Sequence, residues 1–294
     1  MRILVTGGSG FLGAALVRAA TAAGHTLAVL TRSPREGSAA RQLVGSLAQP
    51  PWAAIRQFGP EACVHAAWIA TPGAYLESPA NHDWVRWSLA FLDGLPEVGV
   101  RHLTVLGTCI EYQITGQPLR EDATPLAPQS VYARCKCELH EQLTARQQSG
   151  PLTDTAIAWA RIFYPYGDGE HPARLASSLI AKLRRGEPIL LKTPGSKKDY
   201  IHVEDLAAAL LSVVERRYHG TINVGTGVGV TVEKVAQTLG QLLRRPDLIQ
   251  MPAGAPTDPL DYVVADAGRL RALGWHPQVA LEAGLRRLVE VGRT

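Results

Sequence analysis

Apolar runs of four or five residues alternate with longer stretches of helical period through the first half of the chain. The runs predict buried strands, because they are short and are bounded by glycine or polar residues. The predicted strands cover 2–5, 26–30, 62–66, 102–106 and 155–159. Helices are predicted at 11–23, 81–94 and 130–147. This alternation favours an α/β fold, a doubly wound parallel sheet with helices on both faces.

The alternation breaks after Arg161. Beyond it the pattern predicts shorter, mixed elements, with helices at 173–185 and 206–214 and short strands at 201–203 and 221–224. We therefore expect a smaller mixed C-terminal lobe in addition to the sheet domain. The expected boundaries are 1–163 plus 199–224 for the sheet domain and 164–198 plus 225–294 for the lobe.

Composition narrows the classes of function. Of 294 residues, 46% are hydrophobic and 19% are charged, which indicates an ordinary folded protein. The net charge is only +4, and basic residues form short pairs rather than blocks, so no nucleic-acid partner is expected. No run approaches the roughly 20 apolar residues that span a bilayer, and no signal peptide is recognisable, so no membrane association is expected.

The cysteine pattern indicates the redox state of the cellular compartment and whether a metal site is expected. Cys63, Cys109, Cys135 and Cys137 form no Cys-x-x-Cys pair and have no histidine at zinc-site spacing. Such cysteines are typical of reduced thiols, which indicates the cytoplasm. No metal site is expected.

A glycine-rich turn, Thr6-Gly7-Gly8-Ser9-Gly10-Phe11-Leu12-Gly13, directly follows the first predicted strand. In dinucleotide-binding folds, the first glycine of such a turn permits tight bending and the second admits a pyrophosphate. The third lets the helix pack closely on the strand, and the helix N-terminus offers N–H groups to the phosphates. The turn predicts a Rossmann-type dinucleotide site, with a plain strand–helix turn as the alternative.

The end of the second predicted strand bears on the choice of dinucleotide. An acidic residue there would bind the ribose 2′-hydroxyl of NAD, but Thr31-Arg32-Ser33-Pro34-Arg35 contains no carboxylate. Arg32 could take a 2′-phosphate with two parallel hydrogen bonds, and Ser33 adds a hydroxyl. NADP(H) is therefore expected. NAD(H) is the second choice, because Arg32 could instead stack on the adenine.

A tyrosine and a lysine lie four residues apart in a predicted helix. Tyr132 and Lys136 therefore share one helix face, where an ammonium group should lower the pKa of the phenol towards the working range. Thr108 follows the fourth predicted strand, at the sheet edge where ligands of such folds bind. The three residues form a candidate catalytic group that protonates or deprotonates a carbinol oxygen. A Tyr-x-x-x-Lys pair alone is more often a solvated helix face.

Eight segments together resemble the extended short-chain dehydrogenase/reductase family, which acts largely on nucleotide sugars. They follow the family's order over almost the whole chain. The segments are Thr6–Gly13, His65–Ala67, Thr108–Tyr112, Tyr132–Lys136, Arg161–Gly167, Asp199–Asp205, Asn223–Gly227 and Leu273–Pro277.

The resemblance implies a role for each residue that matches a family position. Catalysis falls to Thr108, Tyr132 and Lys136. Substrate contacts fall to Cys109, Tyr164, Arg174 and Lys198, where Tyr164 stands in place of the usual asparagine and Lys198 in place of an arginine. The implied cofactor-binding residues are Gly7, Gly10, Phe11, Leu12, Arg32, Ser33, Ser46, Leu47, Ala66, Ala67, Tyr132, Lys136 and Ile162.

The residues after Thr108 bear on the reaction. Family 4,6-dehydratases carry an acidic pair there, and this chain has Cys109-Ile110, which argues against dehydration. Cys109 resembles the cysteine of 3,5-epimerising reductases, but that cysteine lies one position further on and works with a histidine, which aligns with Arg174 rather than His171. Cys109 is therefore expected to be a packing residue, with base catalysis as the minority reading. Glu111 is either a second acid or a loop carboxylate.

The remaining reactions are simple hydride transfer and epimerisation. The first choice is NADPH-dependent reduction of a nucleotide-linked 4-keto-6-deoxysugar, as in 4-ketoreductases of deoxysugar pathways. The alternative is a nucleotide-sugar 4-epimerase that retains NAD tightly, and a non-catalytic NADP-sensing protein is the third hypothesis. An intact Thr108, Tyr132 and Lys136 set argues against a sensor.

A homodimer is expected from the family resemblance. The helices at 81–94 and 130–147 carry apolar residues on more than one side, which a four-helix contact between two subunits would bury. These residues are Trp84, Trp87, Phe91, Leu139 and Leu143. Packing on their own sheet is the alternative.

Overall fold

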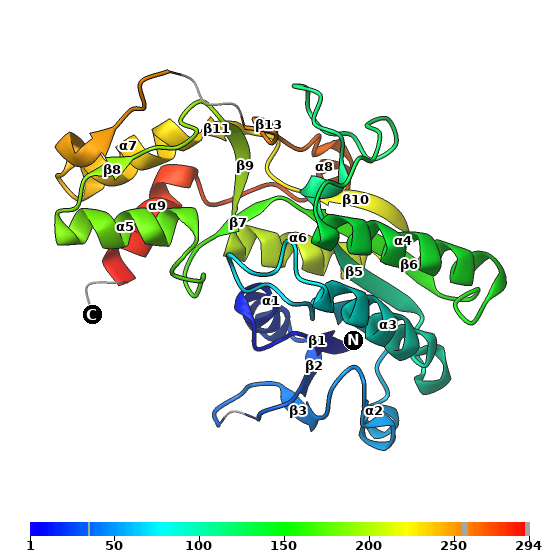
Figure 1. Ribbon diagram of the computed structural model, residues 1–294. Helices are drawn as coiled ribbons and strands as arrows, with labels where there is room; N and C mark the ends of the chain where they lie inside the picture. The colour runs from blue at the N-terminus through cyan, green and yellow to red at the C-terminus, as the bar shows by residue number, and fades with distance from the viewer. Residues whose placement is uncertain (35, 255–257, 292–294) are drawn as a thin grey trace. The chain divides into compact units, whose positions relative to one another are not determined.

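The computed structural model describes residues 1–34, 36–254 and 258–291 (Figure 1). Arg35 therefore lies outside the described residues. The chain divides into two compact units, each held by its own contacts. Unit 1 comprises Met1–Glu111, Leu126–Arg161 and Ala207–Ile222, and unit 2 comprises Tyr112–Pro125, Ile162–Leu206 and Asn223–Thr294.

A seven-stranded sheet with the strand order β10-β6-β5-β4-β1-β2-β3 forms the centre of the fold. The strands β2, β1, β4 and β5 pair in parallel, as the alternating pattern predicts, and β3, which it does not predict, pairs in parallel with β2. The order reverses at β1, which is the switch point of a Rossmann-type sheet. The strands are β1 (Arg2–Thr6), β2 (Thr26–Thr31), β3 (Arg41–Val44), β4 (Ala62–His65), β5 (His102–Thr108), β6 (Ala156–Ile162) and β10 (Gly220–Val224).

Helices connect these strands. Ser130 caps α4, because its side chain accepts a hydrogen bond from the Ala133 N–H. The helices α3 and α4 pack against each other, and they lie side by side in Figure 1. The connecting helices are α1 (Phe11–Ala22), α2 (Trp52–Phe58), α3 (Ala80–Asp93), η1 (Pro96–Val98), η2 (Cys109–Glu111), α4 (Val131–Ser149) and α6 (Val203–Glu215).

The apolar residues of α3 and α4 contribute to the core of their own unit. Phe91, Leu139 and Leu143 are at most 1% exposed, and Trp84 and Trp87 pack against the same core. The alternative packing on their own sheet therefore accounts for these side chains. They give no support to the expected homodimer, which stays a prediction.

The remaining elements form smaller sheets and helices. The strand β9 pairs with β7, β11 and β13, and β12 pairs with β8. These elements are β7 (Tyr164–Tyr166), α5 (Leu175–Arg185), β8 (Ile189–Leu190), β9 (Lys197–His202), β11 (Gly229–Thr231), α7 (Val232–Leu242), η3 (Pro246–Leu248), β12 (Ile249–Gln250), β13 (Tyr262–Val263), α8 (Gly268–Ala272) and α9 (Leu281–Val291).

Two buried carboxylates organise the family-like segments of unit 2. Asp199 accepts hydrogen bonds from the N–H groups of Thr226 and Gly227 and from the Thr226 hydroxyl. Asp205 accepts hydrogen bonds from the N–H groups of Gln278 and Val279. Buried carboxylates that accept several hydrogen bonds in this way stabilise loops. The family-like sequence of these segments therefore has a structural explanation.

Within the described residues, every helix is too short or too polar to cross a membrane.

Candidate active site

The glycine turn has the backbone geometry that a dinucleotide requires. Gly7 lies in the left-handed region with φ 71°, and a Cβ there would lie 2.7 Å from the Ala67 nitrogen. A Cβ on Gly13 would collide with the Gly7 carbonyl oxygen, so α1 reaches the strand only because position 13 lacks a side chain. Gly10 precedes the first turn of α1, whose N–H groups can receive phosphate oxygens. The turn therefore fits a pyrophosphate.

A pocket of about 310 Å³ adjoins the glycine turn. Ser33 lines it, as do Arg18 and Glu36, whereas Arg32 is an exposed residue outside its lining. Glu36 directly follows Thr31–Arg35, the stretch on which the expected preference for NADP(H) rests. The pocket thus presents one cation and one carboxylate.

The other expected cofactor residues lie at three places. Ser46 and Leu47 form a turn after β3, where the Ser46 hydroxyl accepts the Gln49 N–H. Ala66 and Ala67 follow β4, and the Ala67 N–H donates to the Thr6 hydroxyl. Ile162 ends β6 and is buried in unit 2.

The expected catalytic residues meet within unit 1. Thr108 ends β5, and Tyr132 and Lys136 lie one turn apart near the start of α4. The Thr108 side chain lies beside the Tyr132 hydroxyl as a hydrogen-bonding partner that acts to lower its pKa. The Tyr132 N–H donates to the Leu76 carbonyl at 2.9 Å, which holds the beginning of α4. The structure therefore brings Tyr132 and Lys136, which are neighbours on one helix, close to Thr108, which ends a strand 24 residues before Tyr132.

Burial dominates the protonation of this group. It raises the pKa of Tyr132 and lowers the pKa of Lys136 to about 7, with the charge of Glu111 opposing the second shift. The Lys136 ammonium donates to the Leu106 carbonyl at 2.8 Å and lies 3.7 Å from the centroid of the Trp68 ring. The expected lowering of the Tyr132 pKa is therefore wrong, because burial raises that pKa.

Glu111 is a structural carboxylate. It forms an ion pair with Arg161, in which both side chains are at most 3% exposed, and accepts the indole N–H of Trp159. It also accepts the Thr108 N–H at 2.7 Å, so it fixes the end of β5. Of the two readings, the loop carboxylate is the one that these contacts favour.

An aromatic wall of Trp68, Tyr75 and Trp84 surrounds the Tyr132 ring. Tyr75 and Trp68 meet that ring edge-on, at centroid distances of 4.9 and 6.4 Å, and Trp84 packs on Trp68. The indole N–H of Trp68 donates to Asn81, whose amide holds the Tyr75 and Ser78 carbonyls. Sequence reasoning did not identify Tyr75 or Asn81, because Tyr75 lies in a loop and Asn81, in α3, contacts the carbonyls of that loop. Cys109 is 4% exposed in η2, and this burial is consistent with the expected packing role.

A second pocket of about 200 Å³ lies within unit 2 and contains two of the expected substrate residues. Tyr164 and Arg174 line it, together with the Tyr200 ring, which lies 6.1 Å from that of Tyr164. Lys198 is outside the lining, with its ammonium 5.6 Å from the Tyr164 ring centroid. It donates to Asp258 at 3.0 Å and to the Leu260 carbonyl. Lys198 therefore already has anionic and carbonyl partners.

The family model described as "NAD dependent epimerase/dehydratase family" matches residues 3–225. The chain belongs to this family. The match includes the glycine turn, Thr108, Tyr132 and Lys136, so the resemblance to extended short-chain dehydrogenases/reductases is confirmed. The protein is accordingly an enzyme of that type that uses a nicotinamide dinucleotide.

Proteins that are similar to this chain over nearly its full length have names that indicate different reactions. The UDP-glucose 4-epimerase of Corynebacterium glutamicum is 25% identical, covering 99% of this chain and 94% of its own length. UDP-glucuronic acid decarboxylase 6 of Arabidopsis thaliana is 28% identical, covering 99% and 88%. The crystal structure of the Thermus thermophilus UDP-glucose 4-epimerase with NAD has a TM-score of 0.85 at 27% identity, covering 100% and 99%. The predicted α/β fold is thereby confirmed.

Proposed function

We propose that the protein reduces a nucleotide-linked 4-keto-6-deoxysugar with NADPH, as a sugar-nucleotide 4-ketoreductase. The contact between Thr108 and Tyr132 is the observation that carries this proposal, because it joins two hydroxyl groups that can share one substrate oxygen. A nicotinamide dinucleotide, when bound, would supply the hydride that reduces the keto carbon. Tyr132 gives its proton to the keto oxygen, and Thr108 donates a hydrogen bond to the same oxygen.

The surroundings of Thr108 favour a reaction with one proton donor. Dehydration needs acid and base groups for a second carbon, and the residues that follow Thr108 are Cys109 and Ile110. The next carboxylate, Glu111, is committed to Arg161 and Trp159. Reduction of a ketone requires only the proton that Tyr132 supplies and regains from solvent.

Lys136 positions these groups. Its ammonium is fixed by the Leu106 carbonyl and by the face of Trp68, beside the Tyr132 ring. A cation held there attracts the developing phenolate and can bind a ribose hydroxyl of the dinucleotide. The lysine thus connects cofactor binding with proton transfer.

NADP(H) remains the proposed cofactor, with NAD(H) second. Arg32 and Ser33 support a 2′-phosphate at the end of β2. Glu36 supports NAD(H), because a carboxylate repels a phosphate and accepts a ribose hydroxyl. Bound NAD in the similar epimerase structure points the same way.

The proposed division of labour follows the expected domain boundaries. Residues 1–163 plus 199–224 bind the dinucleotide, and 164–198 plus 225–294 bind the nucleotide sugar. The pocket of Tyr164, Arg174 and Tyr200 combines aromatic faces with a guanidinium, which suits a base and a phosphate. The four cysteines are buried thiols, which supports a cytoplasmic enzyme. A homodimer is proposed from family resemblance alone.

A nucleotide-sugar 4-epimerase with retained NAD is the second candidate. The names of the similar epimerases favour it, and the same Thr108, Tyr132 and Lys136 set would serve both reactions. An NADP-sensing protein is the least favoured, because a sensor needs none of the three.

A panel of nucleotide-linked 4-keto-6-deoxysugars incubated with NADPH tests the proposal. We expect stoichiometric loss of NADPH with one of them and a single 4-hydroxyl epimer by NMR. Interconversion of 4-hydroxy nucleotide sugars without net NADPH consumption would replace the proposal with the epimerase.

A further inference from the structure

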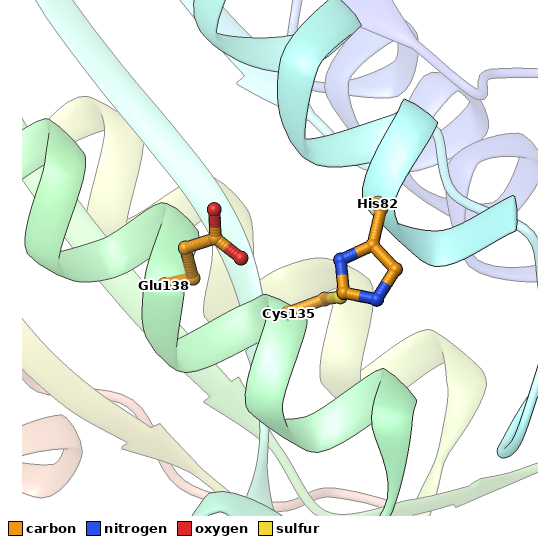
Figure 2. A group of neighbouring side chains, drawn as sticks. All are labelled: His82, Cys135 and Glu138. Carbon is orange, nitrogen blue, oxygen red and sulfur yellow. The ribbon is translucent and has the colours of Figure 1, made fainter. Parts of the chain in front are cut away.

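Three side chains with metal-ligating atoms meet between α3 and α4. A ring nitrogen of His82, the Sγ of Cys135 and a carboxylate oxygen of Glu138 all lie within 4.8 Å of one another. Figure 2 shows that the three side chains come from two neighbouring helices and gather at the gap between them. Residue spacing in the sequence could not reveal this cluster, because 53 residues separate His82 from Cys135.

The distances suit a tetrahedral ion. His82 Nδ1 and Cys135 Sγ form a hydrogen bond in which the two atoms are 3.5 Å apart. A zinc ion with Zn–S of about 2.3 Å and Zn–N of about 2.0–2.1 Å separates its sulfur and nitrogen ligands by about 3.6 Å at a tetrahedral angle. The pair therefore already has the spacing of two ligands on one ion.

The third ligand comes from the same helix face. Glu138 follows Cys135 by three residues, so both side chains project from one side of α4. Glu138 and His82 are exposed, whereas Cys135 is buried. The carboxylate is thus free to close on an ion, and the exposed side leaves space for a water molecule as the fourth ligand.

Charge and ligand type select the metal. A neutral imidazole, a thiolate and a carboxylate carry two negative charges, which balance a dication. Thiolate and imidazole ligands favour zinc-class transition metals over magnesium or calcium. Arg134, which directly precedes Cys135 in α4, donates to the Gln129 carbonyl at 2.6 Å.

We propose that His82, Cys135 and Glu138 bind one zinc-class divalent ion between α3 and α4. The ion links the two helices and stabilises α4, which carries Tyr132 and Lys136. The site does not depend on the proposed substrate or reaction.

Titration of the reduced, chelator-treated full-length chain with Co²⁺ tests this inference, because cobalt reports its ligands by absorption. We expect one ion per chain, a thiolate-to-cobalt charge-transfer band, tetrahedral visible bands and displacement by Zn²⁺. Zn²⁺ should also raise the melting temperature. His82→Gln and Glu138→Gln change exposed side chains, and Cys135→Ser replaces sulfur with oxygen. Each should weaken binding, and His82→Gln by more than about 100-fold, since loss of an outer partner alone costs about 10–100-fold.

Glu141→Gln is the matched control, an exposed glutamate one turn further along α4. It should bind Co²⁺ like the unchanged chain. No charge-transfer band, bands that persist in both His82→Gln and Cys135→Ser, or an equal loss in Glu141→Gln would overturn the proposal. Equal thermal stabilisation of His82→Gln and the unchanged chain by Zn²⁺ would also overturn it.

Discussion

The Glu111 carboxylate and the Arg161 guanidinium form a buried ion pair, with Oε2 and Nε 2.6 Å apart. The same carboxylate holds the Thr108 N–H, so the ion pair reaches the end of β5. A Cβ on Gly107 would lie 2.6 Å from Glu111 Oε1, so the approach of the carboxylate depends on glycine there. Glu111, which the sequence left open as a second acid, thus supports Thr108, a proposed catalytic residue.

Glu111→Gln should destabilise the protein strongly. The substitution removes the counter-charge of a buried guanidinium, and breaking such a pair costs about 3–5 kcal/mol. Urea unfolding measures the loss. Asp83→Asn, which breaks the exposed pair with Arg86, should cost less than about 1 kcal/mol. Equal, small losses in the two variants would contradict the structural role of Glu111.

Tyr132→Phe should separate binding from turnover. The variant loses only the donor hydroxyl, so dinucleotide affinity should be kept while turnover falls by about 10²–10⁴-fold. Fluorescence titration and steady-state kinetics measure the two quantities. Cys109→Ala is the comparison. Its turnover should change little, because Cys109 lies buried in η2 and a simple reduction needs no proton transfer from it. A comparable loss in both variants would assign Cys109 a chemical role.

Arg32→Ala should weaken NADPH binding by about 1–3 kcal/mol and leave NADH binding nearly unchanged. The reason is the loss of a charge-assisted contact with the 2′-phosphate. Glu36→Gln should act in the opposite direction and strengthen NADPH binding, because it removes a carboxylate from the pocket wall. Titration of each variant with both dinucleotides measures these effects. Equal affinity of the unchanged protein for NADPH and NADH would contradict the preference.

His65 should make the fold sensitive to acid. Burial, with a smaller contribution from the Lys136 charge, lowers the pKa of His65 to about 3. The unfolded chain therefore takes up a proton that the folded chain refuses, and stability present above the ordinary pKa of about 6.5 is lost as pH falls towards 3. His65→Gln should show a shallower decline of unfolding free energy between pH 6.5 and 4, measured in urea. Parallel declines would contradict this assignment.

The sequence predicted what local spacing encodes. The glycine turn, the i, i+4 pair of Tyr132 and Lys136, and the long buried strands depend on neighbours in the chain. It missed β3, because this edge strand has only one buried residue, Leu43, and therefore a weak apolar signal. It also missed Glu36, which reaches its pocket through a loop.

Contacts between distant segments could not be predicted from the sequence, for a different reason. The stacking of Lys136 on Trp68 and the meeting of His82 with Cys135 depend on how helices pack, and no spacing rule encodes them. The pKa of Tyr132 was misjudged for the same reason. An i, i+4 spacing shows that two side chains are close. The burial that raises the pKa of Tyr132 follows only from the packed structure.

Isotope transfer tests the central claim most directly. With NADPH deuterated at C4 and a nucleotide-linked 4-keto-6-deoxysugar, reduction at Tyr132 should place one deuterium on the sugar for each cofactor consumed. In D₂O with unlabelled NADPH, no solvent deuterium should enter at C3 or C5 beyond spontaneous exchange. NMR of the product reads both results. An isomerised product formed without net NADPH consumption would contradict the reductase account and establish the 4-epimerase.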